Sequence, residues 1–209
     1  SGHSLENTVL GALYRVAGEG QGIFRPALVG RLDRDTSGVQ LAGISPEGLR
    51  GLEALSRERA IEKTYLALLK GRNGPEEGTI DLPLEDSGAG KDRMKTGSGK
   101  AAVTHYRIKA RGRGVRLASV TPDTGRTHQI RAHFSALGSP LAGDVRYGDA
   151  AWNLELKKSY RFQELFLHCW QVEFSHPVTG GAVKITSSLP EKLQQLLAAT
   201  AAAWPDPLR

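Results

Sequence analysis

The chain has 209 residues, and its 28 lysines and arginines outnumber its 22 aspartates and glutamates, which gives a formal net charge of +6. Hydrophobic residues make up 39% and charged residues 24%, a balance typical of a globular protein that excludes a disordered or fibrous chain. No apolar run is long enough to span a membrane, and the single Cys169 excludes an internal disulfide and a cysteine-based zinc site. We therefore expect a cytoplasmic protein.

Helical and strand-like patterns follow one another irregularly in the N-terminal half. Apolar residues at helical spacing predict a helix over 4–16, with a serine as its cap, and a second helix over 46–59, with a proline in its first turn. Strand-like runs lie at 39–42, between the two helices, and at 63–69, after the second one.

The C-terminal half contains further strands and two helices. Residues 86–100, rich in glycine and basic side chains, are interpreted as a mobile basic loop. Residues 152–164 are polar and poorly periodic, and are interpreted as a surface excursion. The other expected elements are paired strands at 102–108 and 115–120, a helix at 128–137, a hairpin of 166–174 with 182–186, and a terminal helix at 190–203.

Strands thus dominate, and the helices do not follow a strict βαβ alternation. This order favours an α+β fold with a mixed, largely antiparallel sheet and flanking helices. We expect one domain over 1–209.

The histidines and glycine-rich segments form no recognisable metal or nucleotide site. His128 and His133 are five residues apart, so they do not share a helix face, and no Asp or Glu adjoins them. Residues 97–100 are similar to a phosphate-binding loop, but Ala101 replaces the Ser or Thr that would hold magnesium. We therefore expect no metal and no cofactor.

A charged segment at 30–38 places two carboxylates, Asp33 and Asp35, among two arginines before a Thr-Ser-Gly run. Spacing alone favours a charged loop in which Asp35 or Ser37 caps a turn. The alternative is a carboxylate that neighbouring cations keep ionised, as a nucleophile or a base requires.

Two further segments carry candidate binding groups. Tyr65 lies on the apolar strand expected at 63–69, where it either packs in the core or stacks on a base. In 124–133, Gly125 precedes a run of donors at an expected helix start, which is what an anion site needs, whereas a solvated helix end is the alternative. The seven donors are Thr124, Arg126, Thr127, His128, Gln129, Arg131 and His133.

Taken together and in this order, these segments resemble the motifs of the RluA-type pseudouridine synthase family. The resemblance runs from about Ser4 to Leu197, and five motifs in family order argue against a chance match. The motifs are Arg31-Leu-Asp33-Arg-Asp-Thr-Ser-Gly38, Lys63-Thr-Tyr65-Leu-Ala, Gly125-Arg-Thr-His-Gln-Ile-Arg131-Ala-His133, and two flanking segments that begin at Leu137 and Leu165.

The resemblance implies a pseudouridine synthase fold with a central catalytic cleft, and an enzyme that isomerises specific uridines in RNA to pseudouridine. Asp33 is then the catalytic carboxylate, which either attacks C1′ or removes the C2′ proton, and Arg131 pairs with it. Tyr65 stacks on the flipped uracil, its hydroxyl can help to remove the C5 proton, and Leu167 covers the other face of the base. RNA contacts are implied for Arg31, Arg126, His128 and Gln129.

Details of the resemblance favour one class of RNA substrate and leave two other functions as alternatives. The long connection from Tyr147 to His168 is most similar to members that act on large-subunit (23S-type) ribosomal RNA. Action on tRNA and a non-catalytic RNA-binding module are the alternatives. Gly30 stands where most members have histidine and is similar to RsuA-type relatives. The S4-like domain and the first strand of the family pattern are not found, so we expect a catalytic domain, a monomer that binds RNA and no membrane.

Overall fold

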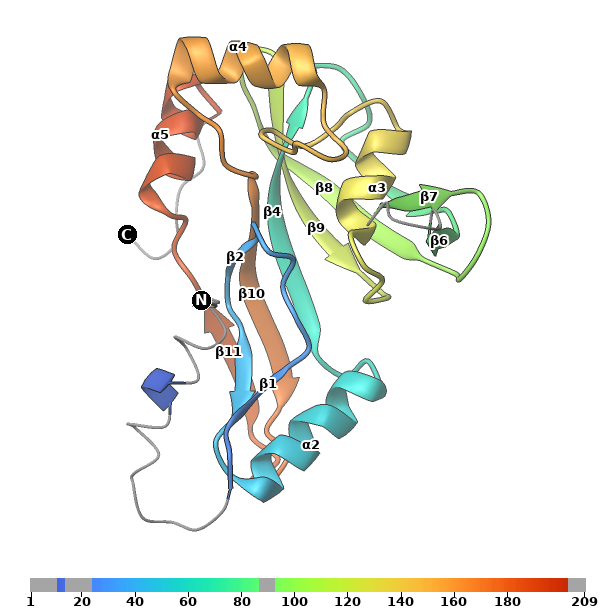
Figure 1. Cartoon of the computed structure of the whole chain (residues 1–209), viewed down its shortest axis with the longest axis vertical. Coiled ribbons are helices and arrows are strands. Elements are labelled where there is room, and N and C mark those ends of the chain that lie inside the picture. The colour runs from blue at the N-terminus through green and yellow to red at the C-terminus, as the bar shows by residue number, and fades with distance from the viewer. Residues whose placement is uncertain (1–10, 14–23, 87–92, 203–209) are drawn as a thin grey trace, which may run out of the picture.

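The computed structural model describes residues 11–13, 24–86 and 93–202 (Figure 1). Of the helix expected at 4–16, only 11–13 fall inside these ranges, and they are helical; the rest of that prediction lies outside the described residues. None of the helices described is long and apolar enough to cross a membrane.

A seven-stranded sheet forms the centre of the protein, in the order β11-β10-β4-β9-β8-β5 (Figure 1). Neighbours along this path are antiparallel, and the short β2 pairs with β10 in parallel. The predicted α+β fold with a mixed, largely antiparallel sheet is confirmed. The strands are β2 (Ser37–Gly38), β4 (Glu62–Lys70), β5 (Glu77–Asp81), β8 (Val103–Arg111), β9 (Val115–Pro122), β10 (Leu167–Ser175) and β11 (Ala182–Thr186). A separate two-stranded antiparallel sheet consists of β1 (Ala27–Val29) and β3 (Leu41–Gly43).

A third, small sheet corrects the interpretation of 86–100 as a mobile loop. Strand β7 (Met94–Thr96) pairs with β6 (Leu84–Asp86), so backbone hydrogen bonds hold residues that were expected to lack regular structure. The pairing was not predicted because each strand has only three residues and the segment is rich in glycine and lysine. Residues 87–92 of the expected loop lie outside the described ranges.

Helix α2 (Pro46–Arg57) begins where the sequence predicts. The Ser45 side chain accepts a hydrogen bond from the Gly48 N–H at 3.1 Å, and Pro46 occupies the first turn, where a missing N–H is harmless. Further along the chain, the described ranges contain α3 (Gln129–Ala136), α4 (Ala150–Tyr160) and α5 (Glu191–Ala199).

Helix α4 shows that the interpretation of 152–164 as a surface excursion is wrong. The Asp149 carboxylate caps the helix by accepting a hydrogen bond from the Trp152 N–H at 2.9 Å. Trp152 and Leu156, four residues apart, are buried on one face. The exposed Leu154 between them breaks the apolar period, which is why the pattern is weak in the sequence.

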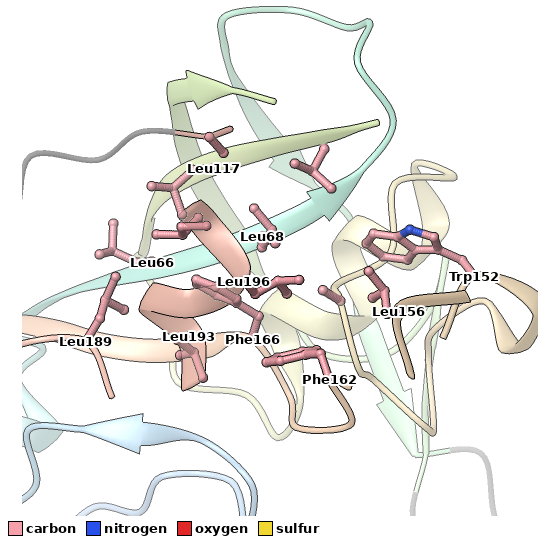
Figure 2. Packing of buried hydrophobic residues seen from close by; sticks show 14 residues of the cluster. Leu66, Leu68, Leu117, Trp152, Leu156, Phe162, Phe166, Leu189, Leu193 and Leu196 are labelled. Atoms are coloured by element: carbon pink, nitrogen blue, oxygen red, sulfur yellow. The ribbon is translucent and has the colours of Figure 1, made fainter. Parts of the chain in front are cut away.

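Helices cover both faces of the sheet at the end where β4 finishes. Leu66 and Leu68 point into a core beneath α4 and α5 (Figure 2), whereas Ala67 and Leu69 belong to a second core that includes Phe134 of α3. This alternation follows the two-residue period of a strand. The opposite end of the sheet, where β4 begins and β9 finishes, borders the cleft described next.

Candidate active site

One cleft of about 720 Å³ brings together the three charged or aromatic segments singled out in the sequence. Its walls come from the turn after β1, the end of α2, the start of β4 and the connection from β9 to α3. Seven of the eight expected site residues line it, and the eighth, Arg131, contacts it through Asp33. The seven are Arg31, Asp33, Tyr65, Arg126, His128, Gln129 and Leu167.

Asp33 stands in a tight turn between β1 and β2. Its carbonyl oxygen accepts a hydrogen bond from the Thr36 N–H at 2.9 Å, and the chain then runs close beside β10. Gly38 is required there, because its φ is +111° and a Cβ would lie 2.2 Å from the carbonyl oxygen of Cys169. The Thr-Ser-Gly run therefore shapes the turn, and the Asp33 side chain remains 23% exposed at the cleft.

Arg131 lies between two carboxylates. Its Nε and Nη2 donate to the two oxygens of Asp144 at 2.7 and 2.9 Å, a bidentate pair that is almost wholly buried. Its Nη1 donates to Oδ2 of Asp33 at 3.4 Å. Asp144 also accepts hydrogen bonds from the N–H groups of Arg146 and Tyr147, both at 2.9 Å. Asp144 thus anchors the guanidinium, and one remaining N–H of Arg131 faces Asp33.

Hydrogen bonds keep both members of the buried pair charged. Burial alone would raise the pKa of Asp144, but the hydrogen bonds from Arg131 and two backbone N–H groups outweigh it and hold that pKa below its usual value. Burial would likewise lower the pKa of Arg131, but the hydrogen bonds and charge of Asp144, together with Asp33, raise it above its usual value. A permanent cation therefore faces Asp33.

His128 lies beside the same carboxylate. Its Nε2 is 4.0 Å from Oδ2 of Asp33, and its Nδ1 is 3.1 Å from the Tyr147 hydroxyl. Its φ of +53° is unfavourable for a residue other than glycine, and such conformations cluster at functional sites. The Tyr147 hydroxyl also accepts a hydrogen bond from the Met94 N–H at 2.6 Å, and the Arg131 Cζ lies 5.2 Å from the centre of its ring. Tyr147 therefore links His128 and Arg131, the two neighbours of Asp33, to strand β7.

Tyr65 lies on β4, between Cys169 of β10 and Val120 of β9. Burial, the neighbouring Cys169 and the charge of Asp33 raise the pKa of the Tyr65 hydroxyl well above its usual range. The phenol is therefore neutral at physiological pH and can donate a hydrogen bond. Leu167, at the start of β10, is buried and supplies apolar surface to the same cleft.

The remaining residues expected to contact RNA differ in how many of their side-chain hydrogen-bonding groups are already used within the protein. The Gln129 Nε2 donates to two groups of β8 at 2.8 and 2.9 Å, and its Oε1 accepts from the Thr124 hydroxyl at 2.6 Å. Its amide thus joins β8 to the start of α3. Arg126 donates to one backbone carbonyl at 3.2 Å, and Arg31 is exposed at the cleft.

The sequence patterns assigned no role to Asp144 and Tyr147. The sequence feature that could have drawn attention to Asp144 is the glycine directly before it. Gly143 has a φ of +71°, and a Cβ there would lie 1.7 Å from the Glu164 carbonyl oxygen. The turn that presents Asp144 therefore requires glycine. Nothing in the spacing indicates that this carboxylate pairs with Arg131.

Comparisons with known sequences agree with these motifs. The family model described as RNA pseudouridylate synthase matches residues 5–136. A ribosomal large subunit pseudouridine synthase C from Haemophilus ducreyi is 38% identical over 174 residues, which are 82% of this chain and 54% of that protein. A ribosomal large subunit pseudouridine synthase D from Zymomonas mobilis is 35% identical over 199 residues, 91% of this chain and 62% of that protein. This chain thus spans little more than half the length of these relatives.

Two solved human structures are similar to the arrangement of the sheet and helices. RNA pseudouridylate synthase domain containing 4 superposes with a TM-score of 0.79 at 23% identity, covering 99% of this chain and 87% of that one. RNA pseudouridylate synthase domain containing 1 superposes with a TM-score of 0.68 at 26% identity, covering 87% of this chain and 82% of that one. The fold expected from the motifs is therefore confirmed.

Proposed function

Because this chain belongs to the RNA pseudouridylate synthase family, we propose that it converts specific uridines in RNA to pseudouridine, with Asp33 as the catalytic carboxylate. The observation that carries the proposal is the ion pair of Asp33 with Arg131 at a cleft that Tyr65 and Leu167 also line. An oriented anion beside aromatic and apolar surface suits a reaction at the sugar of a nucleotide whose base is held in a slot.

The proposed reaction breaks the bond from ribose C1′ to uracil N1 and forms a bond from C1′ to C5. In one route the Asp33 carboxylate attacks C1′, and the bonding electrons leave with N1; C5 of the turned uracil then attacks C1′ and releases the carboxylate. In the other route Asp33 removes the C2′ proton as the uracil leaves, and C5 adds to the resulting glycal as that proton returns. Both routes end with loss of the C5 proton and protonation of N1, and both require an unprotonated carboxylate held in place.

Tyr65 and Leu167 are proposed to hold the uracil between them. The target nucleotide must leave its stack, and base–aromatic stacking of roughly 1–3 kcal/mol offsets part of that unstacking. Because the raised pKa keeps the Tyr65 phenol neutral, it can accept the C5 proton only by passing its own proton on. Asp33, whose charge contributes to that raised pKa, is a nearby acceptor.

Large-subunit ribosomal RNA is the proposed substrate. The relatives at 38% and 35% identity carry that substrate in their names. The cleft adds exposed positive charge at Arg31 and further cations at Lys63 and Arg126, which suits a phosphate backbone.

The test combines turnover with mapping. A large-subunit ribosomal RNA transcript labelled with 5-tritiated uridine should release tritium in the presence of this protein, and the Asp33→Asn variant should release none above background. Cells that lack the protein should lose pseudouridine at defined ribosomal positions. Loss confined to tRNA would contradict the proposed substrate but not the chemistry, whereas RNA binding without tritium release would contradict the chemistry.

A further inference from the structure

Two arginines follow helices in the left-handed backbone region, and only one of them lines the cleft. Arg59 follows α2 with a φ of +59°, and Arg161 follows α4 with a φ of +55°. Glycine is the usual residue at such a position, because a Cβ is unfavourable there. Arg59 is one of the cleft-lining residues, and Arg161 is not.

The backbone after α2 is satisfied without any help from the Arg59 side chain. The Arg59 N–H donates to the Ser56 carbonyl at 3.3 Å, and the Ala60 N–H donates to the Leu55 carbonyl at 2.8 Å, the two bonds of a Schellman motif. Glycine would make both bonds and avoid the unfavourable Cβ. The way the helix ends therefore gives no reason for an arginine.

Packing gives no reason either. The Arg59 side chain is exposed, and its guanidinium makes no ion pair or hydrogen bond with any residue that the structure describes. Glu62 also lines the cleft, but its carboxylate is not within ion-pair distance of the Arg59 guanidinium. Arg31 and Lys63 on this wall are likewise without an ionic partner in the described ranges. Three cations of the cleft lining thus have no ion pair with any residue in the described ranges.

We propose that Arg59 binds a phosphate of the RNA strand that enters the cleft, and that this contact explains an arginine where the backbone favours glycine. The inference rests on the proposed function in taking RNA as the occupant. The end of α2 lies opposite the β9–α3 connection (Figure 1), and residues of both line the cleft, so a strand between them passes Arg59 on its way to Asp33. A guanidinium is always charged and matches phosphate oxygens with paired donors.

Arg59→Gly and Arg161→Gly form a matched pair, because each removes the same side chain from the same backbone conformation. Both should leave the melting temperature unchanged or raise it by a few degrees, since glycine tolerates the left-handed region. RNA affinity is measured by anisotropy of a fluorescein-labelled uridine-containing stem-loop at several salt concentrations. For Arg59→Gly we expect binding weaker by about 5- to 10-fold near 0.1 M salt, and a log–log salt slope less negative by roughly 0.7. Arg161→Gly should change neither the affinity nor the slope.

Two more variants separate charge from backbone freedom. Arg59→Asn, which also tolerates a left-handed backbone, should behave as Arg59→Gly does, and Arg59→Lys should keep the wild-type slope. An unchanged slope in Arg59→Gly, or an equal loss in Arg161→Gly, would overturn the proposal.

Tritium release by the same proteins distinguishes this inference from the proposed function. If the wild-type protein binds RNA but releases no tritium, the proposed pseudouridine synthase activity is contradicted. The salt slope of RNA binding by Arg59→Gly still tests the contact between Arg59 and a phosphate. If the wild-type protein releases tritium but Arg59→Gly keeps the wild-type salt slope, only the proposed Arg59–phosphate contact is contradicted. Wild-type protein that binds no RNA would contradict both.

Discussion

The two carboxylates on either side of Arg131 have opposite surroundings. Asp144 is completely buried, shares two short hydrogen bonds with the guanidinium and accepts two more from backbone N–H groups. Asp33 is 23% exposed at the cleft, and its single hydrogen bond from Arg131 is 3.4 Å long. Asp144 thus accepts four hydrogen bonds from the protein, whereas Asp33 accepts one long bond from Arg131 and keeps lone pairs open to the cleft.

The comparison shows how one arginine can stabilise the fold through Asp144 and also orient the carboxylate that we propose to be catalytic. A carboxylate whose lone pairs are all engaged is a poor nucleophile, whereas one that is oriented but not saturated keeps a reactive oxygen. Because Asp144 takes most of the guanidinium, Arg131 orients Asp33 without occupying it. We therefore expect substitutions at Asp33 to affect turnover and substitutions at Asp144 to affect stability.

The largest effect is expected from Asp33→Asn. The amide keeps the shape of the side chain but loses the anion, so single-turnover tritium release should fall by about 10⁴-fold or more. The free energy of unfolding in urea should change by only about 0.5 kcal/mol, because the side chain is partly exposed and makes one long ion pair. Activity near that of wild type would remove Asp33 from its proposed role.

Asp144→Asn should instead destabilise the fold. It leaves Arg131 buried without its bidentate partner, and breaking a buried pair in this way costs about 3–5 kcal/mol, measured by urea unfolding. The double variant Arg131→Met with Asp144→Leu removes both charges and should recover much of that stability while remaining inactive. If the single variant unfolds like wild type, Asp144 is not the anchor of the guanidinium.

Tyr65→Phe should have a smaller effect, confined to turnover. The ring still stacks, but proton transfer through the hydroxyl is lost, and we expect a rate lower by roughly 10- to 100-fold at saturating RNA. Tyr65→Ala should lose stacking as well, which weakens RNA binding. A Phe variant that turns over at the wild-type rate would show that the ring alone matters.

The smallest effect is expected for the way stability depends on pH between about 5 and 8, compared between wild type and Asp144→Asn. The folded-state pKa of Asp144 lies below its unfolded value of about 3.9, so its contribution to stability is present above that pH and is lost as pH falls through the folded pKa. Urea midpoints of wild type and Asp144→Asn should therefore run in parallel above about pH 5, where any decline belongs to His133, whose pKa is lowered by burial. Below about pH 4 the midpoint should fall less steeply in Asp144→Asn than in wild type. A difference between the two proteins that already begins near pH 6 would contradict the assignment to Asp144.

Local signals predicted the elements in which propensity and packing agree. Helix α2 carries a serine cap, a proline in its first turn and an apolar face, and β4 contains the apolar run 65–69, so both could be predicted. Helix α4 was missed because only Trp152 and Leu156 mark its buried face. Strand β7 was missed because three residues are too few to show a period, and only pairing with β6 makes them a strand.

The members of the proposed site, and the kind of element that carries each, could be predicted from the sequence: Asp33 in a turn, Tyr65 on an apolar strand and Arg131 near the start of a helix. The pairing of these groups could not be predicted, because it depends on contacts between segments far apart in the chain. Arg131 gives two N–H groups to Asp144, 13 residues away in the chain, and one to Asp33, 98 residues away. Local sequence encodes backbone preference and apolar period, whereas the partner of a buried charge depends on which distant segments the sheet brings together.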